Sequence, residues 1–226
     1  MSCTKQRIPG GWSDCEVAVG QHFFRLHTPA DPDRFLDHLE SPETATQPHL
    51  ADPYWAKLWP AAPLLAAAIA RSGVQRGTRV LELGCGSGLV GIAALASGLE
   101  VTFSDYVPLA VELALENAAR NGFHEAKGIV IDWRAVERDF VEPFPLIIAA
   151  DVTYDRTNID PLLDALERLL APRGQAWFGD AGRSPAADFL RRAMDRGWSV
   201  LLFDEHDVPA VAPVLGRYQR IVLRRR

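Results

Sequence analysis

Cysteine is scarce in this chain, with three residues, Cys3, Cys15 and Cys85, among 226. Their number is odd and their spacing matches no set of metal ligands, so the sequence predicts neither a disulfide framework nor a metal site. Free thiols are typical of a reducing interior compartment. We therefore expect a cytoplasmic protein.

Long apolar runs and an excess of positive charge are also missing. No stretch is long enough to cross a bilayer, and the N-terminal sequence MSCTKQRIPGGWSD lacks the apolar core of a signal peptide. The formal net charge is −5, and the basic residues 224–226 are interpreted as a solvated end. We expect a monomer with neither a membrane nor nucleic acid as a partner.

The residues that are present suit one globular domain, because 48% of them are apolar. From residue 79 onward, apolar β-rich runs alternate with helical patterns, which predicts repeated βα units and a parallel sheet. Helices are expected from about residue 89, over 109–121 and over 158–170. The expected strands are RVLELG, EVTFSD, GIVIDW, PLIIAAD and QAWFGD, and the early ones read as continuous apolar runs and not as alternating patterns, as in strands that helices cover on both faces.

Two more strand patterns, WSVLLFDE and RYQRIVLRR, close the chain. The segment between them contains Pro209 and Pro213 and no pattern of helical length. An antiparallel pair at one edge of the sheet is therefore predicted, which brings the strand count to seven.

The first 60 residues are predicted to form an extension packed on a core domain of residues 61–226. Alternating residues on either side of Gly20-Gln21 predict a hairpin over 16–26. A short helix is expected over 33–40, followed by an extended connector that reaches Pro53.

A glycine-rich turn, Gly84-Cys85-Gly86-Ser87-Gly88, follows the first strand of the sheet. Glycines allow a tight turn and a close approach of the backbone to a ligand, so Gly84, Gly86 and Gly88 are predicted to bind a cofactor. The run from Gly86 to Gly91 also matches the weak dinucleotide pattern G-x-G-x-x-G. Glu82 would repel a pyrophosphate but suits an ammonium or sulfonium group, which favours S-adenosylmethionine over NAD.

Side chains at the ends of the next two strands suit the nucleoside part of such a ligand. Asp105 ends the second strand, where a carboxylate can bond a ribose diol, and Tyr106 after it is a candidate for the adenosine pocket. Asp132 can accept a hydrogen bond from the adenine amine, and Trp133 can stack on its ring. A capping aspartate and a packing tryptophan are the alternative interpretation of this last pair.

With the motif LELGCGSG and the strand-end Asp105, residues 79–226 resemble a class I S-adenosylmethionine-dependent methyltransferase. The resemblance implies an α/β, Rossmann-like, doubly wound sheet of seven strands. It also implies that the last strand inserts antiparallel to an otherwise parallel sheet.

A narrower resemblance comes from Ala150-Asp151-Val152-Thr153-Tyr154, which is similar to the D-x-x-Y signature of methyltransferase family 16, largely protein lysine methyltransferases. The segment DPYWAKLWP is similar to one in the group that acts on the β subunit of the electron-transfer flavoprotein. That group usually has glycines after W-P and a G-D-P-x-R segment after strand five. Here Ala61-Ala62 and Gly179-Asp180-Ala181-Gly182-Arg183 stand at those places.

The chemistry implied is transfer of a methyl group to the amine of a protein lysine. Asp151 is expected to attract and orient the amine, and Tyr154 to offer a phenolic oxygen and a ring face. Ala150 and Trp59 are expected to line the cofactor site, with Trp59 as its wall, while Trp55 anchors the core.

Several alternatives stay open. The acceptor could be a small-molecule amine or another protein side chain, and the fold could serve as a non-catalytic binding module or an NAD oxidoreductase. An RNA methyltransferase is disfavoured because no basic, aromatic-rich stretch is present. A hydrolase is disfavoured because the nucleophile pattern G-x-S-x-G is absent.

Overall fold

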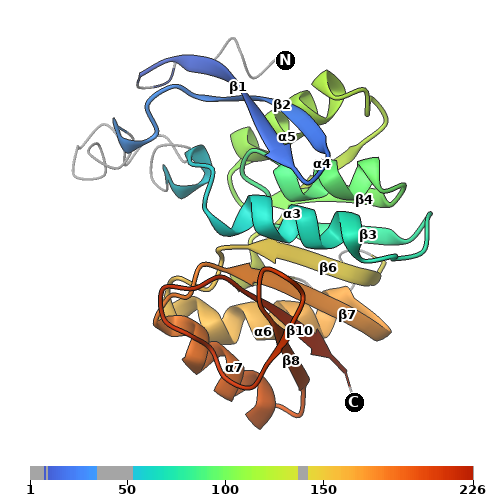
Figure 1. The fold of residues 1–226 in the computed structure, drawn as a ribbon, viewed down its shortest axis with the longest axis vertical. Helices are drawn as coiled ribbons and strands as arrows, with labels where there is room; N and C mark the ends of the chain where they lie inside the picture. Colours follow the sequence, from blue (N-terminus) through green and yellow to red (C-terminus); the bar gives the residue numbers. More distant parts are fainter. Residues whose placement is uncertain (1–7, 9, 35–52, 137–141, 226) are drawn as a thin grey trace.

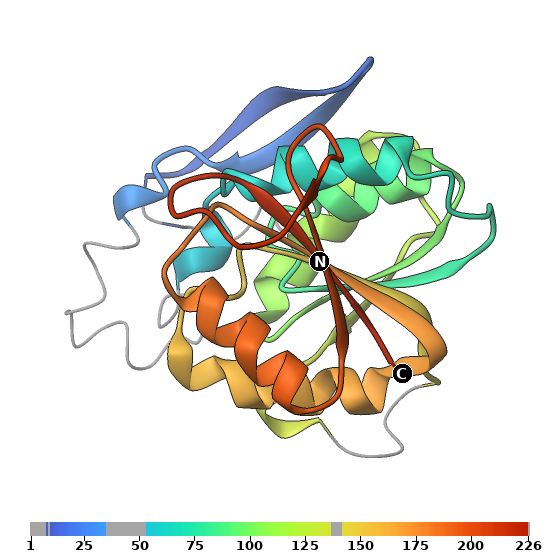
Figure 2. The same ribbon diagram turned by 60° about the horizontal axis from the view of Figure 1, so that its bottom comes forward.

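The computed structural model describes residues 8, 10–34, 53–136 and 142–225. A central sheet lies between two layers of helices, and a separate hairpin lies on one of these layers (Figures 1 and 2). The strands of the central sheet, in spatial order, are β5 (Lys127–Val130), β4 (Glu100–Asp105), β3 (Arg79–Leu83), β6 (Phe144–Ala150), β7 (Leu170–Asp180), β10 (Gln219–Arg224), β8 (Ser199–Phe203) and β9 (Pro209–Ala210).

The direction of these strands confirms the predicted fold class. Strands β5, β4, β3, β6 and β7 are parallel, and β10 pairs antiparallel with both β7 and β8. Strands β8 and β10 form the predicted antiparallel pair toward one edge of the sheet, and the last strand, β10, is inserted between β7 and β8. The eighth strand, β9, has two residues and pairs with the end of β8.

Helices α3 (Ala61–Arg71), α4 (Leu89–Ala96) and α5 (Pro108–Arg120) cover one face of the sheet, and α6 (Ile159–Leu169) and α7 (Pro185–Asp195) cover the other (Figure 2). Successive residues of one strand serve the two faces. In β3, Val80 packs with the α3 and α4 side, whereas Leu81 and Leu83 pack with the α6 and α7 side. Burial on both faces explains why β3 has apolar side chains at successive positions, from Val80 to Leu81.

The predicted helices agree with α4, α5 and α6 to within a residue or two. Helix α7 is a further helix that the sequence analysis missed. Its inward side chains Ala186, Phe189, Leu190 and Ala193 follow helical spacing, and Pro185 occupies its first turn. The pattern was therefore readable from the sequence.

The predicted hairpin is confirmed as β1 (Trp12–Val19) and β2 (His22–Pro29), which lies beside α5 (Figure 1). The expected helix and connector fall mostly on 35–52, outside the described residues. The described residues also include the short 3-10 helices η3 (Pro53–Ala56), η4 (Trp133–Ala135) and η5 (Arg156–Asn158). The division into domains at residue 60 stays a prediction. Within the described residues, no helix combines the length and apolar character needed to span a membrane.

The strand order reverses between β3 and β6, since β4 and β5 follow β3 on one side while β6 and β7 lie on the other. In open α/β sheets, ligands bind beyond the carboxyl ends of the strands at such a reversal. The glycine turn follows β3 and Asp151 follows β6. The topology thus brings both predicted motifs to one crevice.

Gly91, in the first turn of α4, offers a test of this packing. A Cβ atom there would collide with the Phe103 ring and the Glu82 carboxylate. We expect Gly91→Ala to lower the free energy of unfolding by about 1 to 3 kcal/mol, measured by urea denaturation.

The exposed Ala96 on the same helix provides the control. Ala96→Gly should lower the free energy of unfolding by about 1 kcal/mol, the ordinary preference of a helix for alanine. Stabilisation by Gly91→Ala would contradict the packing described here.

Candidate functional site

A cavity lies at the carboxyl ends of β3, β4 and β6. Ten of the twelve site residues predicted from the sequence line it, whereas Gly88 and Asp132 do not. Those ten are Trp59, Glu82, Gly84, Gly86, Asp105, Tyr106, Trp133, Ala150, Asp151 and Tyr154.

The glycine turn forms one wall of the cavity. Gly84, Gly86 and Gly88 have φ values of +64°, +48° and +81°, a left-handed conformation that favours glycine. A Cβ at Gly86 would lie 3.1 Å from the Trp55 carbonyl oxygen. Gly88 does not face the cavity and starts α4 instead, and its N–H donates to the Cys85 carbonyl at 2.7 Å.

Glu82 lies beneath this turn and is 3% exposed. Its Oε2 accepts a hydrogen bond from the Gly91 N–H at 3.0 Å. Burial raises the pKa of this carboxyl to about 8, and the nearby negative charge of Asp105 adds to the effect, while the Gly91 N–H opposes it. The site therefore contains a carboxyl group that holds its proton near neutral pH.

Asp105 is buried at the end of β4. Its two oxygens accept from the Gly86 N–H at 3.2 Å and from the Val107 N–H at 3.0 Å, which ties the end of β4 to the glycine turn. Beside it, the Tyr106 ring lies 4.9 Å from the guanidinium of Arg134.

Asp132 faces Arg134 instead of the cavity. Its carboxylate accepts from Nε at 2.8 Å and from Nη2 at 2.9 Å, and it also accepts from the Arg134 backbone N–H. The hydrogen bond from Arg134 lowers the pKa of this carboxyl. This is the capping arrangement, and the contact with adenine stays a prediction. Trp133 lines the cavity, and its buried Nε1 has no hydrogen-bond partner among the described residues.

Asp151 follows β6 and its side chain is fully buried. Its Oδ2 accepts from the Ala61 N–H at 2.8 Å, at the start of α3, and its Oδ1 accepts from Arg183 Nη1 at 2.7 Å. Burial raises the pKa of this carboxyl, while the Ala61 N–H and the Arg183 charge oppose the rise. The backbone of Asp151 has φ +57°, a strained value for a residue with a side chain and one that recurs at functional sites.

Arg183 is a residue that the sequence analysis did not include in the site. Its guanidinium binds Asp151 and also lies 5.0 Å from the Trp59 ring. Trp59 donates from Nε1 to the Tyr54 carbonyl at 2.8 Å. Arg183 stands at the arginine position of the G-D-P-x-R segment described above, and this match could have identified it from the sequence.

Aromatic rings form another part of the cavity wall. The rings of Tyr54 and Tyr154 lie 5.2 Å apart, and Tyr54 lies 6.0 Å from Trp59. Trp55 is buried with Val107 and Leu109 in the core, as expected of an anchor. Because η3 ends at Ala56, the two tryptophans do not share one helix.

Among the described residues, no cluster of three or more His, Cys, Asp or Glu side chains is arranged to hold a metal ion. The groups that line the cavity and can contact a ligand are the glycine turn, the carboxyl groups and the aromatic rings.

Comparisons with known proteins agree with this geometry. A family model described as lysine methyltransferase matches residues 46–191. The chain is 31% identical over 144 residues to the EEF1A lysine methyltransferase 3 of Mus musculus. This alignment covers 62% of this chain and 62% of the mouse protein. It is 34% identical over 176 residues to the electron transfer flavoprotein beta subunit lysine methyltransferase of Danio rerio, covering 76% of this chain and 64% of that one. The match thus spans less than two thirds of either relative.

Solved structures share the fold. The ribosomal protein L11 methylase of Lactobacillus delbrueckii subsp. bulgaricus has a TM-score of 0.58 at 24% identity, covering 74% of this chain and 79% of that one. The N-methyltransferase NodS of Bradyrhizobium japonicum, in complex with S-adenosyl-L-homocysteine, has a TM-score of 0.58 at 18% identity, covering 85% of this chain and 97% of that one.

The buried Glu82 predicts a specific pH dependence of stability. Its pKa is about 8 in the folded protein against an ordinary 4.5. The stability that it contributes is therefore fully present below about pH 4.5 and is lost as the pH rises through 8. Relative to Glu82→Gln, the parent should lose up to about 1.4 kcal/mol of unfolding free energy per pH unit between pH 5 and 8.

Urea denaturation at four pH values in this range measures the difference. Glu125→Gln, at an exposed position, is the control and should follow the parent at every pH. A constant offset between Glu82→Gln and the parent would mean that Glu82 titrates normally.

Proposed function

The chain belongs to the lysine methyltransferase family, and on this premise we propose that it transfers a methyl group from S-adenosylmethionine to a lysine side chain of a protein substrate. The observation that carries the proposal is the convergence of the glycine turn, the carboxyls of Glu82 and Asp105, and the pair Asp151 and Tyr154 on one cavity. The two relatives described above are named for different target proteins. The proposal therefore names the lysine and leaves the target protein to experiment.

The residues of the cavity fit this cofactor. Gly86 keeps the space in front of the Trp55 carbonyl open, since a Cβ there would lie 3.1 Å from that oxygen. The indole Nε1 of Trp133 is a buried donor that a ligand acceptor would satisfy. When bound, S-adenosylmethionine supplies an electrophilic sulfonium methyl group, so the protein mainly has to hold a neutral amine in line with it.

Glu82 and Asp105 are the residues that would hold the cofactor. A cationic ligand would favour the ionised form of Glu82, because an opposite charge lowers a carboxyl pKa. Asp105 is oriented by the N–H groups of Gly86 and Val107. A carboxylate at the end of this strand suits a ribose diol, because each of its oxygens can accept more than one hydrogen bond.

Asp151 would attract and orient the lysine amine. Both of its oxygens are held by donors, Ala61 on one side and Arg183 on the other, so the carboxylate is fixed before the substrate arrives. A fixed charge in a dry site interacts strongly with an approaching amine. Lysine arrives protonated, and burial of its amine in the cavity favours the neutral form that reacts.

Tyr154 and its neighbours would surround the lysine side chain. The Tyr154 ring packs against Tyr54, which accepts the Trp59 indole N–H through its carbonyl. A channel walled by aromatic rings suits the apolar methylenes of lysine and can contact its cationic end. This arrangement supports a lysine side chain as the acceptor.

Two isosteric substitutions separate cofactor binding from transfer. Asp105→Asn should weaken the binding of S-adenosylhomocysteine by roughly tenfold or more, because a hydrogen bond to a charged group is lost. Asp151→Asn keeps an oxygen for the Ala61 N–H but sets an amide NH2 group against Arg183, so it should weaken S-adenosylhomocysteine binding less than Asp105→Asn does and should transfer methyl groups about a hundredfold more slowly.

Isothermal titration calorimetry and initial transfer rates measure the two effects. Tyr154→Phe is the comparison for Asp151→Asn, because it keeps the ring and removes only the hydroxyl group. An Asp151→Asn variant with the parent's transfer rate would remove this carboxylate from the mechanism.

The proposed activity itself is tested with labelled S-adenosylmethionine and a cell extract. We expect the label in protein, recovered as methyl-lysine by mass spectrometry, and entering protein about a hundredfold more slowly when Asp151→Asn replaces the parent. S-adenosylhomocysteine at a hundred times its Kd should stabilise the protein by about 2.7 kcal/mol, whereas NAD should have no effect.

Label found only in small molecules would refute the lysine acceptor. Stabilisation by NAD alone would refute the cofactor.

A further inference from the structure

Asn117 on α5 is a fully buried polar residue that the proposed reaction does not use. Its side-chain amide makes three hydrogen bonds to the backbone of distant segments. Oδ1 accepts from the His27 N–H at 2.6 Å, and Nδ2 donates to the His27 carbonyl at 3.0 Å and to the Ser87 carbonyl at 2.9 Å. One side chain therefore joins β2 of the hairpin to the glycine turn.

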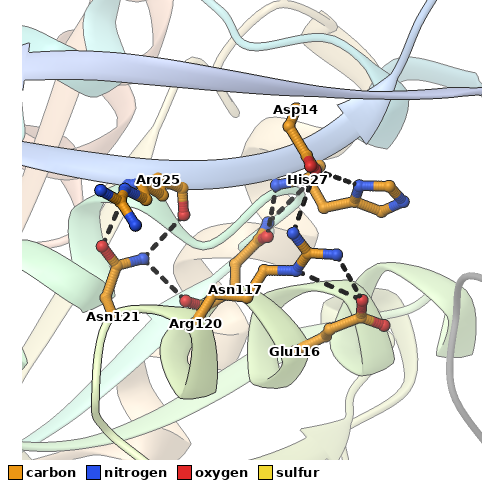
Figure 3. A network of polar contacts seen from close by, with 7 residues as sticks. All are labelled: Asp14, Arg25, His27, Glu116, Asn117, Arg120 and Asn121. Atoms are coloured by element: carbon orange, nitrogen blue, oxygen red, sulfur yellow. Dashed lines mark hydrogen bonds and ion pairs between the residues drawn. The ribbon is translucent and has the colours of Figure 1, made fainter.

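Asn121, one helical turn later, docks the same strand in the same way (Figure 3). Its Oδ1 accepts from the Arg25 N–H at 3.0 Å, and its Nδ2 donates to the Arg25 carbonyl at 2.8 Å and to the Asn117 carbonyl at 2.8 Å. Helix residues four apart share a face, as do strand residues two apart. Asn117 and Asn121 can therefore each bind the backbone of one residue of β2, His27 and Arg25 respectively. Asn117 reaches the glycine turn, and Asn121 does not.

An ion-pair network surrounds this docking site (Figure 3). Asp14 on β1 accepts from the His27 ring at 2.6 Å and from Arg120 at 3.0 Å, and Arg120 also binds Glu116. These pairs are partly exposed, and such pairs contribute little to stability. The main polar link between the hairpin and α5 is therefore made by the buried amide of Asn117 and the half-buried amide of Asn121.

The bond from Asn117 fixes the orientation of one peptide group in the turn. The Ser87 carbonyl accepts from Asn117, and the N–H of the same peptide group, on Gly88, donates to the Cys85 carbonyl at 2.7 Å. Both polar ends of a planar group are then held. Ser87 is 7% exposed, so without Asn117 its carbonyl would lose a donor in a place with little access to water.

The hairpin also contacts the Trp55 segment, which faces Gly86 of the same turn. Trp12 stacks on the His27 ring with 5.1 Å between centroids and lies 6.5 Å from Trp55. The Trp55 carbonyl is the group that faces Gly86. The hairpin thus supports the turn through Asn117 and supports the segment opposite the turn through Trp12.

We propose that Asn117 is a positioning residue of the cofactor site, which holds the Ser87–Gly88 peptide group and makes the N-terminal hairpin part of that site. The effect on cofactor binding rests on the proposed function. A turn that is held in place before binding costs less to order when the ligand arrives. Loss of the amide should therefore reduce affinity and leave the reacting groups unchanged.

The test compares Asn117→Ala with Asn121→Ala, since each substitution removes three hydrogen bonds and both loosen the same strand. In the ligand-free protein, hydrogen exchange of the Gly86 and Gly88 amides should be at least tenfold faster in Asn117→Ala and unchanged in Asn121→Ala. The Kd for S-adenosylhomocysteine and the KM for S-adenosylmethionine should rise about tenfold in Asn117→Ala alone, with kcat close to that of the parent.

Equal effects of the two substitutions on exchange and on Kd would overturn the proposal, because general loosening of the hairpin would then explain them. Parent-like exchange and Kd in Asn117→Ala would also overturn it. If Asn117→Ala does not fold, Asn117→Ser, which leaves a smaller cavity, is held to the same criteria. Failure of the parent to bind S-adenosylhomocysteine would refute the proposed function, and the exchange measurement would still decide the role of Asn117.

Discussion

The buried carboxylate of Asp151 is the interaction on which the geometry of the site depends. It caps α3 through the Ala61 N–H and binds the Arg183 guanidinium, which in turn lies against Trp59. A buried carboxylate left without these donors would be costly, so the three segments are held together strongly. The end of β6, the start of α3 and the loop after β7 therefore form one rigid corner of the cavity.

The opposite corner is built around the glycine turn, and its constraint is steric as well as electrostatic. Glu82 lies under the turn and Asp105 beside it, so two acidic groups share a buried space. A Cβ atom at Gly91 would collide with Glu82, and one at Gly86 would make a tight contact, 3.1 Å, with the Trp55 carbonyl oxygen. The conformation of the turn is thus restricted by the residues packed against it. Asn117 on α5 also donates a hydrogen bond to the Ser87 carbonyl of the turn.

Much of this could be predicted from the sequence because its signals are local. The apolar runs predicted the parallel strands, and the segments with helical periodicity predicted α4, α5 and α6 at nearly their observed bounds. The position of a motif at the end of a strand was enough to place Glu82, Asp105 and Asp151 at one edge of the sheet. Helix α7 was missed even though its pattern is regular.

The partners of the site residues could not be predicted in this way. Asp151 and Ala61 are 90 positions apart, as are Asn117 and His27, and no local pattern pairs them. The carboxylate of Asp132 binds the guanidinium of Arg134, two residues away, in charge-assisted hydrogen bonds that the sequence analysis did not foresee, and its contact with adenine stays a prediction.

The sequence by itself determined the α/β architecture, the glycine turn and the chemical types of the residues around the cavity, since periodicity and motif spacing act over a few residues. The tertiary structure decided which donors hold each carboxylate, that Arg183 joins Asp151 to Trp59, and that the hairpin reaches the turn through Asn117. Those contacts exist only after the sheet has brought distant segments together. Their strength comes from burial, which the folded chain alone provides.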